Sequence, residues 1–362
     1  MSDPSSSQLP SQADIERALA DFADPETGRG VIENAQVRDL KIDGPRVSLG
    51  LALTTHSAPL WDETCRALVA RLTTRFPALK EVKVDLAVLD RPPQPRGELG
   101  ITVKSIIAVG SGKGGVGKST IAASLALGLS KAGSKVGLLD ADVYGPSIPH
   151  LLGATGKPEV VNSRIQPVDA AGLKMISIGL LVAPGEAVVW RGPMLHHTLT
   201  QFLRDVAWGP LDYLVIDMPP GTGDVALSLS QLVPLTGAVV VCTPQDVALL
   251  DAVKAVAMFR KVNIPVLGMV ENMSGFVCPE CGKRYDIFGS GGAKRRAADL
   301  NIPFLGEVPI TISIRVNGDA GQTTANFTDP QAAPYLEAIV KTLVRNLSEA
   351  GPAAAPLPTL KV

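Results

Sequence analysis

The residues best suited to chemistry in this chain form one glycine-rich run between an apolar segment and an Ala-rich segment. The glycines would let backbone N–H groups wrap phosphate oxygens, and a following helix would add the positive end of its dipole. We therefore predict a nucleotide-binding loop for ATP, with Lys118 on the phosphates and the Ser119 hydroxyl on Mg²⁺. The run matches G-x-x-x-x-G-K-[ST] and consists of Gly112, Lys113, Gly114, Gly115, Val116, Gly117, Lys118, Ser119 and Thr120.

Three aspartates follow this loop at the ends of apolar segments. Asp140 and Asp142 lie two residues apart at the end of a predicted strand, 135–142, so both point to one side. Asp217 lies in a second predicted strand, 212–219, where a carboxylate is expected to hold Mg²⁺ through water. Because ligands bind at the carboxyl ends of parallel strands, we expect these carboxylates beside the phosphates.

Two further segments complete the predicted nucleotide site. Asn272 follows another apolar segment, 265–273, and either contacts the nucleotide or forms a turn. The segment after Asp217 predicts a switch loop that senses the γ-phosphate. That loop consists of Pro219, Pro220, Gly221, Thr222, Gly223 and Asp224.

Cys278 and Cys281 form a C-x-x-C pair, which predicts a tight turn that aims two thiolates at one metal centre. Zinc and iron–sulphur centres normally take four protein ligands, and this pair supplies two. Cys65 and Cys242 lie in apolar patterns and are predicted to be small core residues. The economical solution is a homodimer in which two pairs meet on a two-fold axis, with zinc or an iron–sulphur cluster bound between them.

Composition excludes several classes of protein. The chain has 362 residues, of which 46% are hydrophobic and only 4% aromatic, so it can bury a large aliphatic core. Its net charge of −1 gives no global reason to bind nucleic acid or an anionic membrane. Four cysteines exclude a disulfide scaffold. A polar start and the absence of a long apolar run predict a cytoplasmic protein.

Changes in residue composition and in the pattern of apolar residues predict five parts of the chain. These are a disordered leader (1–12), a small α+β domain (13–90), a Pro-rich linker (91–100), an ATPase domain (101–348) and a mobile tail (349–362). In the fourth part, apolar strands alternate with helices. We therefore predict an α/β fold, a P-loop NTPase with a mostly parallel sheet covered by helices on both faces.

Lys113 extends the loop to GKGGVGKS, which resembles the deviant Walker A class of MinD and ParA proteins, nitrogenase iron protein and Mrp/ApbC carriers. With ENMSGFVCPECGKRYDIFGSGGA, WRGPM and DADVYGPSIP, residues 100–345 resemble the Mrp/ApbC/Nbp-type iron–sulphur carriers. The N-terminal part is similar to an iron–sulphur-assembly-associated domain. Ala58 stands near the place where relatives of that domain often carry a cysteine, so we assign this domain no metal ligand.

The resemblance implies a role for each matched residue. Lys113 would reach the nucleotide of a partner subunit, Asp142 would position the attacking water, Asp140 would lie near the Mg²⁺ shell and Asn272 would contact adenine. It also implies a labile [4Fe–4S] cluster that bridges two subunits and is passed to apo iron–sulphur proteins, together with cluster-assembly factors as partners and ATP hydrolysis as the regulator of the cycle.

Three other functions share parts of this pattern. A positioning or partitioning ATPase would bind membrane or DNA, but the final APLPTLKV is not a basic amphipathic helix. In a zinc-stapled ATPase the cysteine pair would only hold the dimer together, and the sequence does not separate zinc from iron–sulphur. A nitrogenase-type reductase draws its cluster from two cysteines far apart in the chain, unlike this C-x-x-C pair.

Overall fold

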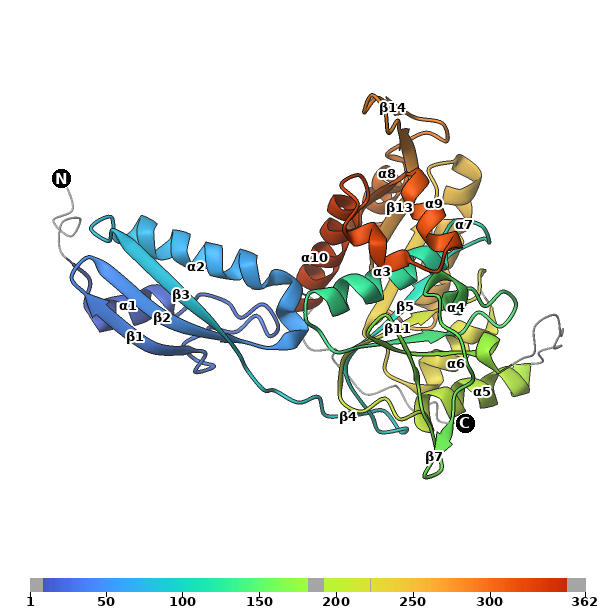
Figure 1. Cartoon of the computed structure of the whole chain (residues 1–362), viewed down its shortest axis with the longest axis horizontal. Coiled ribbons are helices and arrows are strands. Elements are labelled where there is room, and N and C mark those ends of the chain that lie inside the picture. The colour runs from blue at the N-terminus through green and yellow to red at the C-terminus, as the bar shows by residue number, and fades with distance from the viewer. Residues whose placement is uncertain (1–8, 182–191, 222, 350–362) are drawn as a thin grey trace. The chain divides into compact units, whose positions relative to one another are not determined.

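The computed structural model describes residues 9–181, 192–221 and 223–349, shown in Figure 1. Among these residues, 9–92 together with 344–349 form one compact unit, and 93–343 form the other. Each unit has its own cluster of buried aliphatic side chains. We describe the two units separately.

The first unit pairs a small sheet with two helices. Its strands, in the order β1 (Val37–Asp43), β2 (Arg46–Leu53) and β3 (Glu81–Val88), join β1 to β2 antiparallel and β2 to β3 in parallel. A parallel pair needs a crossover, which η1 (Thr55–Leu60) and α2 (Trp61–Arg75) supply. Helix α1 (Gln12–Leu19) begins directly after Ser11. The reason is the capping box that Ser11 forms with Asp14.

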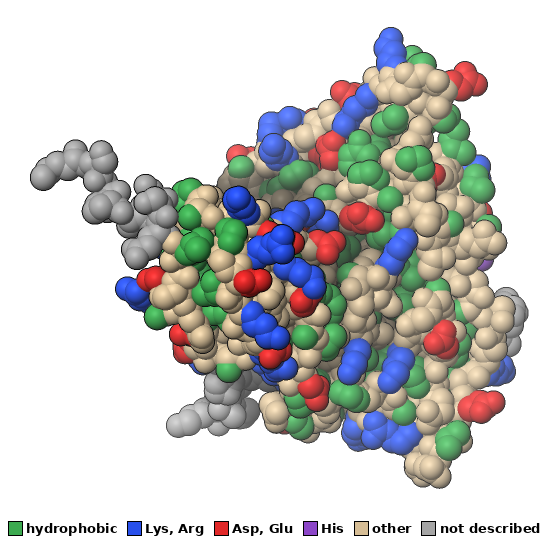
Figure 2. Space-filling view, turned by 60° about the vertical axis from the view of Figure 1, so that its left-hand side comes forward, with side chains coloured by type: hydrophobic (Ala, Val, Ile, Leu, Met, Phe, Trp, Pro, Cys, Tyr) green, Lys and Arg blue, Asp and Glu red, His purple; other side chains and the backbone are tan. Residues whose placement is uncertain are grey.

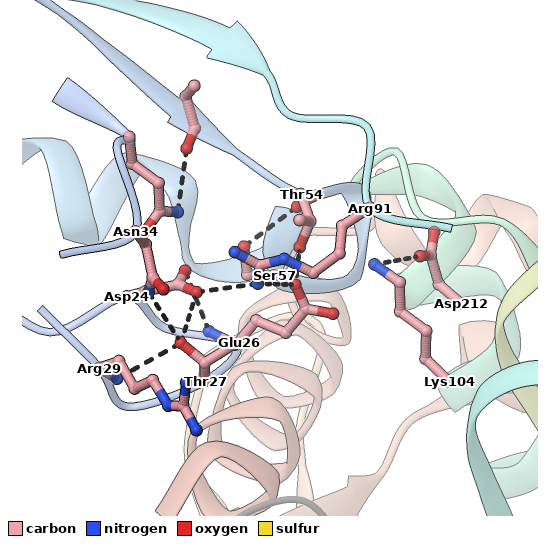
Figure 3. Close-up of polar contacts among 12 residues, drawn as sticks. Asp24, Glu26, Thr27, Arg29, Asn34, Thr54, Ser57, Arg91, Lys104 and Asp212 are labelled. Carbon is pink, nitrogen blue, oxygen red and sulfur yellow. Dashed lines mark hydrogen bonds and ion pairs between the residues drawn. The ribbon is translucent and has the colours of Figure 1, made fainter. Parts of the chain in front are cut away.

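A polar cluster orders the DPETG turn of this unit. Asp24 is fully buried and accepts hydrogen bonds from the Thr27 hydroxyl (2.8 Å) and the Glu26 backbone N–H (3.4 Å). Arg91 pairs with Asp24 (3.2 Å) and Glu26 (2.9 Å), and the Thr54 hydroxyl donates to Glu26 (2.6 Å). Figure 3 shows these side chains turned toward one another. The cluster gives the buried Asp24 carboxylate its counter-charge and ties Arg91 to this unit.

Replacing Leu68 of α2 by alanine should destabilise the first unit and leave nucleotide binding intact. The Leu68 side chain is fully buried against the sheet, so its loss leaves a cavity. We expect the free energy of unfolding of this unit to fall by about 2–5 kcal/mol. Urea unfolding measures this loss, with Leu86→Ala as the control because Leu86 is exposed. Equal effects of the two substitutions would contradict the packing described here.

The second unit is built on a large sheet whose central strands run parallel. Its main path is β14-β13-β12-β5-β11-β6-β10-β9, with β15 paired to β13 and β4 to β5. The antiparallel pairs are at the periphery, where β4, β9 and β14 join β5, β10 and β13. The strand bounds are β4 (Pro95–Arg96), β5 (Ile101–Gly110), β6 (Val136–Asp140), β9 (Val168–Ala170), β10 (Leu173–Ser177), β11 (Leu211–Asp217), β12 (Gly237–Cys242), β13 (Val266–Val277), β14 (Arg284–Tyr285) and β15 (Phe304–Ile310), with a separate hairpin of β7 (Val160–Val161) and β8 (Arg164–Ile165).

Helices cover this sheet as the sequence predicts. Every residue of β6, β11 and β12 is buried, which requires cover on both faces of the sheet. The helix bounds are α3 (Lys118–Lys131), α4 (Ile148–Leu151), α5 (Gly192–Arg204), α6 (Asp224–Leu232), α7 (Asp246–Lys261), α8 (Gly292–Asp299), α9 (Ile312–Asp319) and α10 (Ala333–Glu349), with 3₁₀ turns η2 (Ile178–Leu180) and η3 (Thr323–Phe327).

The surface agrees with the balanced composition. On the face in Figure 2, basic and acidic side chains are interspersed. Among the residues whose structure is described, no helix is both long enough and apolar enough to cross a membrane.

Candidate functional site

The phosphate loop joins strand β5 to helix α3, as predicted. Gly115 and Gly117 have φ of +79° and +80°, a left-handed conformation that favours glycine. The backbone also passes too close to neighbours for side chains, because a Cβ on Gly112 would strike the backbone of Asp251 and one on Gly117 would strike the Asn272 amide. The loop is further tied by the Ser111 hydroxyl, which donates to the Lys113 carbonyl (2.9 Å).

Lys118 connects three parts of the predicted site. Its buried ammonium donates to Asp217 Oδ1 (2.6 Å) and Ser119 Oγ (3.2 Å), and lies 3.4 Å from Asp142 Oδ2. Strands β5, β11 and β6 are neighbours in the sheet, so the segments that follow them meet at one edge. The structure therefore brings together Lys118, Ser119, Asp142 and Asp217. Lys118 balances two buried carboxylates that would otherwise repel each other.

The surroundings of Asp217 suit a Mg²⁺ ion. This residue is fully buried, and its Oδ2 atom has no hydrogen-bond partner. Burial raises the pKa of Asp217, although the Lys118 ammonium opposes that shift. A buried carboxylate oxygen without a partner and a nearby serine hydroxyl are hard oxygen ligands of the kind that Mg²⁺ prefers. The residues present thus fit the predicted ion, which Ser119 and, through water, Asp217 would hold.

Asp140 is saturated by contacts within the protein. Its Oδ1 atom accepts from the Asp142 backbone N–H (3.1 Å), and its Oδ2 atom accepts from the Ser177 hydroxyl (2.9 Å) and the Ile148 N–H (3.3 Å). Desolvation by burial, aided by the charge of Asp217, raises the pKa of Asp140 to about 7. These bonds order the turn that carries Asp142. The role of Asp140 near the Mg²⁺ shell stays a prediction.

Asp140 should make the ligand-free protein lose stability as the pH rises from about 4 to about 7. The unfolded residue releases its proton near 3.8, whereas the folded residue holds it to about 7. The unfolded state binds fewer protons across this window, so the free energy of unfolding falls, by up to roughly 4 kcal/mol. Asp140→Asn should flatten this slope in urea unfolding. Parallel slopes for variant and wild type would contradict the assignment.

The predicted switch loop lies beside the phosphate loop. Pro220 lines the same cavity as the phosphate loop, and the Gly221 N–H donates to the Ser111 carbonyl (2.9 Å). Asp224 begins α6. Thr222 lies outside the described residues, as do Trp190 and Arg191 of the WRGPM motif. The remaining members, Pro219 and Gly223, lie in the described loop between β11 and α6.

Two adjoining cavities open at the phosphate loop. One, of about 300 Å³, is lined by the loop and by Asp142. The other, of about 350 Å³, is more apolar and includes Asn272, Phe288 and Ile314. Gly117, Thr120 and Leu151 line both. A nucleotide with its phosphates in the first cavity would place its base and ribose in the second, where Asn272 donates to the Val116 carbonyl (2.9 Å).

The cysteine pair lies in a separate, exposed turn between β13 and β14. Cys278 is half-buried and Cys281 exposed, and both are free thiols. The Cys278 N–H donates to the Lys283 carbonyl (3.0 Å), and the Gly282 N–H donates to the Cys278 carbonyl (2.9 Å). Backbone N–H groups of Cys281 and Glu280 lower the pKa of Cys278, which favours the thiolate that binds metal.

The other cysteines differ in their surroundings. Cys242 is fully buried in β12, and burial raises its pKa to about 12. Cys65 is half-buried in α2, and desolvation raises its pKa too. In the described part of the chain, no group of three or more His, Cys, Asp or Glu side chains is placed to hold a metal ion. One chain thus offers the two thiols of Cys278 and Cys281, and the half-site stays a prediction.

Sequence reasoning missed Phe288 and helix α9, both of which line the apolar cavity. It also missed the acidic residue Glu271, which accepts from the Gly291 (2.7 Å) and Ala293 (2.6 Å) N–H groups at the start of α8. Glu271 and Phe288 lie within the quoted motif ENMSGFVCPECGKRYDIFGSGGA, but their contacts depend on the pairing of β13 with its neighbours. The glycines around Phe288 are the one available signal of a loop under geometric constraint.

Comparison with known proteins decides the family. A family model described as NUBPL iron-transfer P-loop NTPase matches residues 102–344. The chain belongs to this family of P-loop NTPases. A second model, iron–sulfur cluster assembly protein, matches residues 12–86. The resemblance inferred from the sequence and the predicted fold class are both confirmed.

Individual relatives of this P-loop NTPase agree. An iron–sulfur cluster carrier protein of Deinococcus radiodurans is 45% identical, over 92% of this chain and 96% of the relative. The mouse iron–sulfur cluster transfer protein NUBPL is 48% identical, over 78% and 90%. A nucleotide-binding protein from Archaeoglobus fulgidus in complex with ADP superposes with a TM-score of 0.56 and 43% identity, over 63% and 90% of the chains. A cell-division ATPase MinD of Pyrococcus furiosus, at 22% identity and a TM-score of 0.50, shares the fold.

Proposed function

We propose that this protein is an ATP-hydrolysing carrier that binds a [4Fe–4S] cluster between two copies of the chain and passes it to apo-proteins. The observation that carries the proposal is an accessible cysteine pair in the same unit as a formed phosphate loop. The names of the relatives support the cargo, and the Archaeoglobus protein in complex with ADP supports the nucleotide.

The nucleotide site suggests how ATP would bind without leaving the buried Asp217 carboxylate unpaired. Before binding, Lys118 compensates Asp217 and Asp142. In the complex, Lys118 would turn to the phosphates, and Ser119 and Asp217 would hold Mg²⁺. The fully buried Asp217 carboxylate would then keep a counter-charge in both states, which avoids the large cost of an isolated carboxylate. Bound Mg²⁺ would supply positive charge that offsets the negative charge of the phosphates.

Hydrolysis would follow by in-line attack of water on the γ-phosphate. Asp142 is the candidate for positioning that water, because it lies at the phosphate cavity and is held by the Tyr144 (3.3 Å) and Gly145 (3.2 Å) N–H groups. Lys118 would stabilise the charge that develops on the phosphate oxygens. Lys113 would do the same from the partner subunit, and Asn272 would contact the base.

The cargo site needs a second chain. One copy contributes two thiolates, whereas a [4Fe–4S] cluster takes four. A homodimer with the Cys278/Cys281 pairs on its two-fold axis supplies the full set. The turn is exposed to solvent at Cys281 and partly exposed at Cys278. This exposure also suits a cluster that is transferred, since transfer requires access for the recipient's thiols.

Anaerobic reconstitution with iron and sulphide tests the proposal. We expect visible absorption of a cluster, about four iron atoms per dimer, and activation of an apo iron–sulphur enzyme by the loaded protein. The matched control is protein loaded with zinc, which should activate nothing. If the protein retains zinc alone after reconstitution, or if the loaded protein fails to activate the recipient, the carrier function is wrong and the pair is a structural staple.

A further inference from the structure

The cysteine pair lies at the tip of an arm of the chain. This arm begins and ends at the more apolar of the two cavities, which we call the base cavity. We define the cysteine arm as residues 273–288, which leave the cavity along β13, turn at Cys278 and Cys281, and return through β14. β14 lies beside the last two residues of β13, at the top of the view in Figure 1. Met273 begins the arm and Phe288 ends it, and both line the cavity next to Asn272. A ligand in this cavity would therefore touch both roots of the arm.

The arm is internally braced, so movement at its roots would reach its tip. Phe276 and Val277 pair with Tyr285 and Arg284 in an antiparallel ladder. Arg284 donates to the Ser274 carbonyl (3.0 Å) and forms an ion pair with Glu307 of β15 (2.7 Å). These contacts span the arm just below the turn that carries the thiols.

Gly275 allows Arg284 to lie directly on the arm's backbone. It has a φ of +69°, and a Cβ there would come within 2.7 Å of Arg284 Nε. The bracing therefore includes both backbone pairing and a guanidinium packed across the two strands.

The far end of the arm, at Phe288, is exposed, while the start of the helix beyond it is anchored by hydrogen bonds. The Phe288 ring is 40% exposed, so a planar base entering the cavity could cover it. Gly289 and Gly291 follow with φ of +90° and +70°, conformations that favour glycine, the residue with the widest choice of backbone conformations. Beyond them, Glu271 anchors the start of α8 through two backbone N–H groups. If Phe288 shifts, we therefore expect the glycines and the arm to change conformation, while α8 stays in place.

We propose that Phe288 is the positioning residue through which nucleotide in the base cavity changes the state of the Cys278/Cys281 pair. The pair would respond to nucleotide through the arm, with Phe288 as the contact and Arg284 as the brace. This inference rests on the proposed function only in taking ATP or ADP as the occupant of the cavity. It needs no assumption about which metal centre the thiols bind.

The test measures alkylation of the metal-free, full-length protein by iodoacetamide, mapped to each cysteine by mass spectrometry. ADP and a non-hydrolysable ATP analogue are each added to saturation, checked by direct binding. For the wild type we expect nucleotide to change the alkylation rates of Cys278 and Cys281 by about fivefold or more. Cys65 of the first unit is the internal reference and should react at a constant rate.

Phe288→Ala should bring this ratio close to one at saturating nucleotide. Ile287→Ala is the matched control, because Ile287 is 61% exposed and is not among the residues that line the cavity. That control should keep the wild-type ratio. Arg284→Gln removes the brace away from the cavity, so it should also lower the ratio while nucleotide still binds.

Three results would overturn the proposal. They are a wild-type ratio of one at saturation, an unchanged ratio in Phe288→Ala, or, if that variant no longer binds nucleotide, an unchanged ratio in Arg284→Gln. Because the protein is metal-free, failure of iron–sulphur reconstitution leaves this test standing. Loss of coupling likewise leaves the carrier function standing.

Discussion

Replacing Lys118 by methionine will lower the rate of ATP hydrolysis by about 10²–10³-fold or more. Removing one group that stabilises developing charge costs at least this much in enzymes of comparable design. Among the residues that the structure describes, Lys118 is the one whose side chain forms ion pairs with both Asp217 and Asp142 at the phosphate loop. Steady-state phosphate release measures the loss. A variant that hydrolyses ATP within tenfold of the wild-type rate would exclude Lys118 from the reaction.

The same substitution should also destabilise the ligand-free protein, which requires a control. Without the ammonium, the buried carboxylates of Asp217 and Asp142 lose their counter-charge, at a cost of about 3–5 kcal/mol. The double variant Lys118→Met/Asp217→Asn removes one of those charges. It should therefore recover much of the stability and remain inactive. Thermal unfolding and hydrolysis measured on the same samples separate the two effects, and recovered activity in the double variant would contradict the proposed roles.

Replacing Cys278 by serine will remove nearly all of the bound iron, as much as replacing both cysteines. In a cluster shared by two chains, each single substitution deletes two of the four thiolates, because both copies carry it. Iron and sulphide per dimer, measured after anaerobic reconstitution, should fall to roughly a tenth or less of the wild-type value. Oligomeric state, measured by light scattering, should show that the iron-dependent dimer is lost with the cluster.

Cys65→Ser is the matched control for this experiment. Cys65 is partly accessible like Cys278, but it lies in the first unit, so its replacement should leave the iron content unchanged. Binding of ADP should be unaffected in both variants, since neither residue lines the nucleotide cavities. A Cys278→Ser protein that keeps half of its iron would point to a site within one chain and contradict the shared centre.

The local sequence determined the elements that carry this chemistry. The phosphate loop was predictable because its function depends on backbone geometry that a short run of glycines encodes, and Gly115 and Gly117 adopt that geometry. The central strands were predictable because both of their faces are buried, so they are apolar throughout. The C-x-x-C pair and its incomplete ligand count were also visible, because spacing and number are properties of the chain.

Only the tertiary structure decided which of these residues meet. Lys118 and Asp217 are far apart in the chain, and they pair because β11 lies beside β5 in the sheet. The structure extends β13 to Val277, beyond the predicted end at 273, and so carries the thiols away from Asn272 on one continuous strand. It also returns Phe288 to the nucleotide cavity. Strand order and the path of a return loop arise from packing across the whole sheet, which no local pattern of residues records.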